Sequence, residues 1–126
     1  MFRIRDDRGA AAVEFALVLP VLLVLLFGIM EVGRLFQVQA TLSAAAREGV
    51  RVMAVQDDPQ AARSAVLAAA TSLSPVLGAD QVQVTPGRCT GPTATATVTV
   101  RYTSPWLTGF PGGWDVTGEA VMQCGG

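Results

Sequence analysis

The chain has 126 residues and a formal net charge of -1, with nine arginines, no lysine and no histidine. Because no arginine cluster lies on a polar face, the charge pattern does not predict binding to nucleic acid. Two cysteines without any histidine supply too few ligands for a metal site within one chain. The length suits one small domain joined to an anchor.

The first strong feature is an apolar run over residues 10–30, of which residues 15–30 carry no charge. As a helix, residues 10–30 would measure roughly 31 Å, close to the ~30 Å hydrocarbon core of a bilayer. Three arginines precede the run: Arg3, Arg5 and Arg8. By the positive-inside rule we expect a single-pass protein of the cytoplasmic membrane, with its N-terminus in the cytoplasm and its C-terminal part outside.

Two residues interrupt the apolar character of this segment. Pro20 removes one helical hydrogen bond, which predicts a kink near residues 16–20. Glu14 lies near the start of the run, and burying a lone carboxylate in lipid is costly, so an acid kept there indicates a functional role. The alternative is that its side chain reaches back to the headgroups at the membrane edge.

Three interpretations of this segment compete. A cleaved signal peptide needs small residues just after the apolar core, and residues 27–31, FGIME, fit that requirement poorly. An uncleaved anchor explains the apolar run and the arginines but gives no role to Gly9 or Glu14. A prepilin-type leader is cut before the apolar run, and this third interpretation places the cut directly after Gly9.

The third interpretation is supported by a family resemblance. The string GAAAVEF at residues 9–15 resembles the processing site of type IV pilin-like proteins. Together with the Leu-Pro pair at residues 19–20 and AREG at residues 46–49, it is similar to the TadE family, minor pilins or pseudopilins of the tight-adherence (Flp) system. The resemblance covers residue 8 to about residue 54, and the rest of the chain matches only in general character.

The resemblance implies that a prepilin peptidase cuts between Gly9 and Ala10 and removes a cytoplasmic leader, residues 1–9. Such an enzyme needs an accessible, extended bond, and a glycine allows close approach to the backbone. Glu14 becomes the fifth residue of the mature chain, followed by Phe15, and both would serve recognition and assembly. In pilins the comparable acid is thought to pair with the N-terminal amine of a neighbouring subunit, which offsets part of the cost of desolvating both charges.

Beyond the membrane, residues 31–56 predict an extracytoplasmic continuation of the same helix. Its apolar positions recur in alternating steps of three and four, as one helix face does: Leu35, Val38, Leu42, Ala45, Gly49 and Val52. We expect this face to cover the chain's own sheet. The alternative is bundling with other helices in a filament core, which the small residues 44–46 and Gly49 would permit.

Residues 57–126 predict a small extracytoplasmic module. Asp58 suits an N-cap and Pro59 the first position of a helix. Residues 61–73 then form a second helix, with four residues on one face: Ala62, Val66, Ala69 and Leu73. Alternation predicts three strands, over residues 81–85, 93–103 and 115–124. We therefore expect an α+β chain: a long N-terminal transmembrane and amphipathic helix, a short second helix, and a small antiparallel sheet of about three strands.

Cys89 and Cys124 both lie in the part that is expected outside the cytoplasm, where a disulfide between them is the simplest interpretation. In the chain-entropy model this bridge would add about 3 to 4 kcal/mol to the stability of so small a sheet. Two free thiols, or pairing with another subunit, are the alternatives.

Three aromatic residues lie in a Gly- and Pro-rich loop between the last two predicted strands: Trp106, Phe110 and Trp114. They could form an exposed docking tip. The alternative, which we favour, is that the rings fold back onto the small core or settle at the lipid headgroups.

No histidine, phosphate-binding glycine loop or nucleophile with a partner base is found, so we expect no enzyme, cofactor, metal or small-molecule substrate. The resemblance implies a structural or assembly subunit of a tight-adherence pilus, held in the membrane or drawn into the surface pilus. Its implied partners are a prepilin peptidase, the pilus secretion ATPase with its inner-membrane platform, the major Flp pilin, other minor pilins and membrane lipid. The rival function is an uncleaved single-pass anchor that carries an extracytoplasmic binding module.

Overall fold

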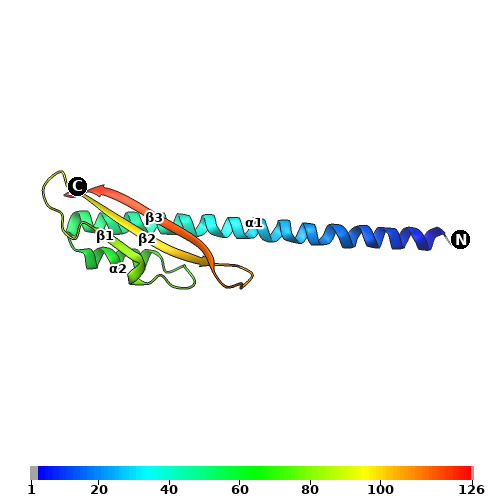
Figure 1. The fold of residues 1–126 in the computed structure, drawn as a ribbon. Helices are drawn as coiled ribbons and strands as arrows, with labels where there is room; N and C mark the ends of the chain where they lie inside the picture. The colour runs from blue at the N-terminus through cyan, green and yellow to red at the C-terminus, as the bar shows by residue number, and fades with distance from the viewer. Residues whose placement is uncertain (1–2, 126) are drawn as a thin grey trace. The chain divides into compact units, whose positions relative to one another are not determined.

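The computed structural model describes residues 3–125, with side chains from residue 7 onward. Met1, Phe2 and the side chains of Arg3 and Arg5, all in the expected leader, lie outside the described residues. Two helices precede a sheet of three strands (Figure 1). Contacts within the chain define two compact units, Met1–Arg34 and Leu35–Gly126. The expected α+β class is confirmed.

The first helix, α1, extends over Arg3–Gln56 and has 54 residues. Ala, Leu and Val dominate its sequence, and Pro20 is its one internal proline. The helix continues on both sides of that residue, and the kink expected there stays a prediction. Residues 35–56 of α1 belong to the second unit, which we call the module.

Within the module, α1 buries a stripe of eight residues in the core: Val38, Leu42, Ala45, Ala46, Gly49, Val50, Met53 and Ala54. The helix covers the chain's own sheet, as expected, but the predicted stripe was too narrow. Leu35 and Val52 are only partly buried, whereas Val50 and Met53 are fully buried. The cause is that α1 packs against two elements, the sheet and the second helix, so that two neighbouring rows of side chains are covered.

The second helix, α2, extends over Pro59–Ala69. The predicted cap is confirmed, because Asp58 Oδ1 accepts hydrogen bonds from the backbone N–H of Gln60 at 2.9 Å and of Ala61 at 3.3 Å. The predicted end at residue 73 was wrong. The amide of Ala70 bonds to the carbonyl three residues back, which tightens the last turn, and Ala70 is buried where Ala69 was expected.

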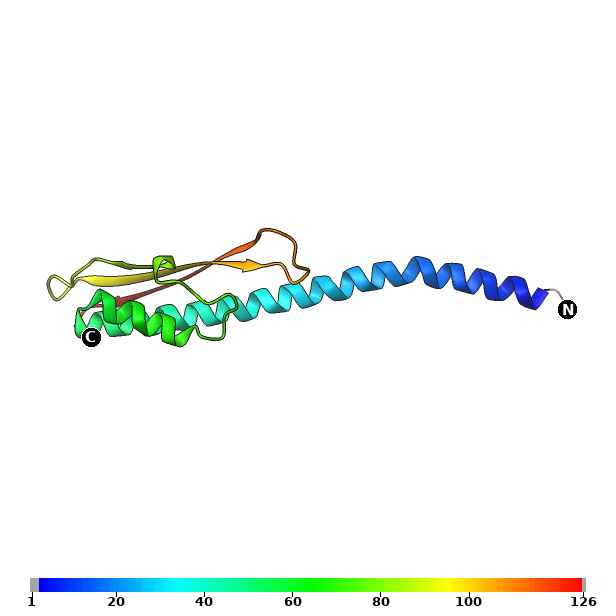
Figure 2. The ribbon, with the colours of Figure 1, turned by 90° about the horizontal axis from the view of Figure 1, so that it is seen from below.

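The sheet has three antiparallel strands in the order β1-β2-β3: Val82–Thr85, Thr95–Pro105 and Gly113–Gln123. A short 3-10 turn at Ala79–Gln81 delays the first strand by one residue. The buried face of β2 carries Ala96, Val98, Val100 and Tyr102. The β2–β3 ladder extends to the pair Pro105–Gly113, beyond the predicted strand ends. The helices cover one face of this sheet (Figure 2).

A close backbone contact joins β3 to α1 inside the module. A Cβ atom at Gly118 would lie 2.7 Å from the carbonyl carbon and oxygen of Leu42, so no side chain fits there. Nearby, Gln39 Nε2 donates to the carbonyl oxygen of Thr117 at 3.0 Å. A glycine inside a strand is the sequence signal for such an approach, which the strand alternation alone did not identify.

The predicted disulfide between Cys89 and Cys124 is present, with a Cα–Cα distance of 5.9 Å. It joins the segment between β1 and β2 to the end of β3. The backbone N–H of Cys89 also donates to Asp57 Oδ1 at 2.6 Å, which holds the same segment against the end of α1. The bridge therefore closes the end of the module opposite the β2–β3 hairpin loop.

Candidate processing and assembly segment

The first unit consists of a helix whose apolar side chains are exposed in the described part of the chain. Its most apolar stretch has a mean hydropathy of 2.7 over 18 residues, and none of that stretch is buried in the protein. Phe15 is 65% exposed and Val24 is 74% exposed. The core helix of a water-soluble protein would be mostly buried. An uncovered helix of this length and composition instead fits a single-pass membrane anchor.

The expected scissile bond, Gly9–Ala10, lies inside α1 and is exposed. It is therefore accessible but helical, not extended as a peptidase requires. Gly9 lowers the cost of unwinding, because glycine is about 0.5–1 kcal/mol less favourable than alanine inside a helix. A Cβ atom at Gly9 would meet nothing within 4 Å, so packing within the chain does not require a glycine at this position.

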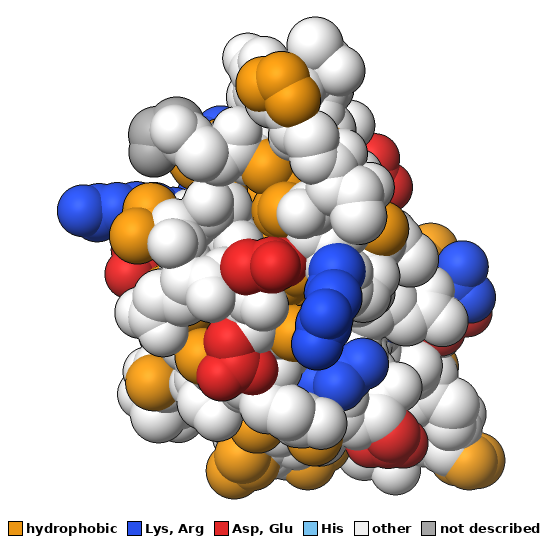
Figure 3. All heavy atoms as spheres, turned by 90° about the vertical axis from the view of Figure 1, so that its left-hand side faces the viewer, with side chains coloured by type: hydrophobic (Ala, Val, Ile, Leu, Met, Phe, Trp, Pro, Cys, Tyr) orange, Lys and Arg blue, Asp and Glu red, His pale blue; other side chains and the backbone are white. Residues whose placement is uncertain are grey.

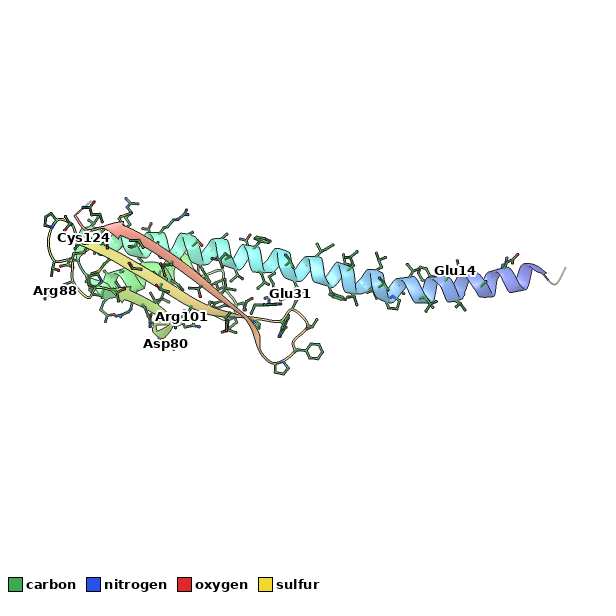
Figure 4. All side chains as sticks on the ribbon, turned by 45° about the horizontal axis from the view of Figure 1, so that its top comes forward. Glu14, Glu31, Asp80, Arg88, Arg101 and Cys124 are labelled. Atoms are coloured by element: carbon green, nitrogen blue, oxygen red, sulfur yellow. A yellow bond between two sulfur atoms is a disulfide. The ribbon has the colours of Figure 1, made fainter. Side chains whose placement is uncertain are left out.

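Glu14 projects from the exposed apolar surface of α1, four residues after Ala10 (Figure 4). Residues four apart share a helix face, so the two lie about 6 Å apart along the axis. Glu14 forms no hydrogen bond or ion pair with the described part of the chain. The next acid, Glu31, pairs with Arg34 at 3.5 Å, just after the apolar run ends.

The three aromatic residues of the hairpin loop separate into a pair and a single ring. Trp106 and Trp114 pack edge to face, with their ring centroids 5.0 Å apart and an angle of 61° between the planes. Phe110 lies between them in sequence and is 70% exposed. Only the tryptophan pair is therefore held by packing within the loop.

No three His, Cys, Asp or Glu side chains of residues 7–125 come together as a possible metal site. A shallow hollow lies on the β2–β3 surface, with Arg101, Thr103 and Asp115 among its lining residues. Asp115 accepts a hydrogen bond from Thr103 Oγ1 at 2.9 Å. These side chains are exposed strand residues, and they do not resemble an arrangement for acid–base chemistry.

An exposed apolar helix of this length, followed by a small α+β module, fits a single-pass membrane-anchored protein. Residues 9–51 match the family model described as TadE-like protein, so the chain is TadE-like over this segment. The match covers 43 of the 126 residues. No curated protein and no solved structure matches the chain.

The matched segment begins at Gly9 and includes Glu14 and most of α1. It ends before α2, the disulfide and the sheet. The family similarity therefore concerns the N-terminal helix and not the sheet of the module.

Proposed function

We propose that this protein is a minor pilin or pseudopilin of a Tad pilus. In this proposal α1 anchors the protein in the cytoplasmic membrane, with the module on the outer side. A prepilin peptidase removes residues 1–9. The carboxylate of Glu14 then forms an ion pair with the new N-terminal amine of Ala10 in a neighbouring subunit. The supporting observation is an acid that has no partner in the described part of the chain, on an exposed apolar helix, five residues after a glycine that no packing contact requires.

The energetic reason for assembly is the cost of two unpaired charges at the membrane. The desolvation penalty is several kcal/mol for each ion, and pairing offsets part of it. Before cleavage the nitrogen of Ala10 is a neutral peptide nitrogen, so Glu14 has no amine to pair with. Cleavage creates that amine, and a docking subunit can then supply the countercharge. Cleavage would thus convert α1 from a helix that only anchors the protein in the membrane to one that can bind a neighbouring subunit.

The proposal further implies contact with the components that extract and polymerise pilins. We expect the pilus secretion ATPase with its inner-membrane platform, the major Flp pilin and other minor pilins as partners. The uncovered apolar surface of α1 is the part of this chain that would pack among other pilin helices once it leaves the lipid.

Cleavage is tested by mass spectrometry of the protein extracted from membranes of cells that contain an active prepilin peptidase. We expect the wild-type chain to begin at Ala10 and Gly9→Leu to keep residues 1–9. Gly28→Leu is the matched control, because a Cβ at Gly28 also meets nothing within 4 Å, and this variant should still be cut. An uncut wild-type chain would overturn the processing step and favour an uncleaved anchor with a binding module.

The role of Glu14 is tested separately with Glu14→Gln, which removes the charge and keeps the size. We expect normal membrane insertion but loss of the protein from sheared surface pili, or loss of the pili themselves. Glu48→Gln, which changes an exposed acid in the module part of α1, should assemble normally. Undiminished assembly of Glu14→Gln would remove the proposed pairing.

A further inference from the structure

We propose that the β2–β3 hairpin tip, residues 105–114, is a second membrane contact. Its aromatic rings would lie in the headgroup layer of the same bilayer that α1 spans, so the ligand is a lipid surface. The inference depends on membrane anchoring by α1 and not on cleavage or pilus assembly. It would assign the module a fixed face toward the membrane.

The hairpin tip is apolar and uncharged although much of it is exposed. No charged residue lies between Arg101 and Asp115. Phe110 is 70% exposed, Trp114 46% and Leu107 43%. In water these side chains leave apolar area unburied. The headgroup layer suits Trp114, because aromatic rings with a polar edge concentrate at that depth, and it borders the hydrocarbon that Phe110 and Leu107 can enter.

The tip is also built to present these side chains. The Trp106–Trp114 ring pair closes its base. The backbone N–H of Gly109 donates to the carbonyl oxygen of Trp106 at 3.1 Å, which forms a turn. Gly109 and Gly112 have φ values of 80° and 90°, a conformation that favours glycine, and they flank Phe110 closely. Phe110 therefore lies in a turn of the backbone that leaves its side chain 70% exposed.

The direction of β3 places the tip at the end of the module where α1 enters it. Three contacts align β3 with α1: Thr117 with Gln39, Gly118 with Leu42, and Gly125 with Ala54. Both elements therefore run the same way. From Thr117 back to Trp114 the strand covers about 10 Å, and from Gln39 back to the first residue of the module the helix covers about 6 Å.

The tip therefore reaches at least as far as Leu35, the first residue of the module, in the direction from which the chain leaves the membrane. Leu35 follows the last residue of the apolar run, Met30, by five positions. Five helical residues span about 8 Å, comparable to the headgroup layer on one side of a bilayer. Chain connectivity thus keeps the tip within reach of that layer.

The opposite end of the module has a different character. Figure 3 views that end, where acidic and basic side chains lie beside polar and hydrophobic ones. Asp57 and Arg88 are exposed, and Asp57 contacts the segment that carries the disulfide. The opposite end thus carries exposed charges that the hairpin tip lacks, and this difference fits a module that stands on the membrane by its tip. Because the tip has no basic residue, its binding should not require anionic lipid.

The test uses the intrinsic fluorescence of the full chain reconstituted in neutral phosphatidylcholine vesicles. The chain has two tryptophans, Trp106 and Trp114, so its tryptophan emission comes from the tip alone. We expect strong quenching by lipid brominated near the glycerol end of the acyl chain, weaker quenching by lipid brominated near the methyl end, and protection from aqueous iodide. Full quenching by iodide without quenching by either lipid would overturn the proposal. Strongest quenching by the deep bromine would also overturn it, because the rings would then lie in the hydrocarbon core.

Two variants distinguish a specific contact from general exposure. Phe110→Ser should shift the balance between membrane-bound and free tip by about tenfold or more toward the free state, since it removes the largest exposed side chain. The measured result is more iodide quenching and less lipid quenching. Val121→Ser is the matched control: Val121 is 58% exposed on β3 but lies near the other end of the hairpin, opposite Thr97. Equal quenching in both variants would overturn the role of the tip. Purified, reconstituted protein needs no peptidase, so failure here is independent of the pilin proposal.

Discussion

Replacing Gly49 by alanine should destabilise the module, although alanine is the better helix former. Gly49 lies on the buried stripe of α1, where the helix approaches both α2 and the sheet. A Cβ atom there would collide with Cγ2 of Val66 and would lie 3.3 Å from the carbonyl oxygen of Ala62 and 3.4 Å from Cγ1 of Val98. The close approach of α1 and α2 thus depends on the missing side chain.

Two opposing contributions decide the sign of the change. Gly→Ala inside a helix gains about 1 kcal/mol of helix propensity. Overpacking a filled core costs about 1–3 kcal/mol, and the upper part of that range applies here. Val66 is fully buried, and a β-branched side chain in a helix has one strongly preferred rotamer, so it cannot rotate away. We expect a net loss of about 1–2 kcal/mol, or a fall in Tm of about 4–16 °C for a module of this size.

The assay is thermal unfolding of the full chain in detergent, followed by near-ultraviolet circular dichroism. That signal reports the tryptophans and Tyr102 of the module, whereas the far-ultraviolet signal would be dominated by α1. Gly87→Ala is the control, because a Cβ at Gly87 meets nothing within 4 Å, and it should gain about 0.4–1 kcal/mol.

A double variant tests whether the collision with Val66 is the cause. Val66→Ala alone should be destabilising, because it empties part of the core. The double variant Gly49→Ala/Val66→Ala should lose about 0.5–3 kcal/mol less stability than the sum of the two single losses. The reason is that the new methyl group occupies the space that Val66 vacates. Strict additivity, or a Gly49→Ala chain as stable as Gly87→Ala, would refute the reasoning.

Two further predictions concern the stability of the module. Cys124→Ser should lower its unfolding free energy by about 3–4 kcal/mol in the chain-entropy model, measured by urea titration. Reductant should lower the unfolding free energy of the wild-type chain by the same amount and leave that of the variant unchanged. A wild-type urea midpoint that does not move on reduction would contradict the role of the disulfide. Asp58→Ala should cost about 1 kcal/mol through loss of the α2 cap, whereas Asp58→Asn should keep most of it, and equal losses in the two variants would count against the cap.

Local patterns in the sequence predicted the elements of this protein. The apolar run of residues 10–30 indicated a membrane helix, the Asp58–Pro59 pair indicated the start of α2, and the alternation over residues 93–103 indicated β2. Each of these signals depends on neighbours within one or two turns or on a period along one strand. The cysteine pair was predicted for a related reason, because only one partner was available to each thiol within the chain.

Contacts between distant segments were beyond that reasoning. The sequence pattern of α1 alone does not show that α2 and the sheet together cover two neighbouring rows of its side chains. Val50 and Met53 were therefore missed on the buried stripe. The end of α2 was misplaced because the last turn tightens at Ala70, whose amide bonds to the carbonyl of Leu67 three residues back. The separation of Phe110 from the tryptophan pair likewise depends on the strand register, which extends to the tips of β2 and β3.

The sequence by itself determined that this protein has an apolar, membrane-length helix with a lone acid near its start, because hydrophobicity and charge are properties of single residues added along the chain. Only the tertiary structure decided which surfaces remain open. Whether Gly49 and Gly118 are required, and whether the hairpin tip lies at the end of the module where α1 enters it, depends on the packing of β3 and α2 against α1. That packing is between segments far apart in the chain, which no local pattern encodes.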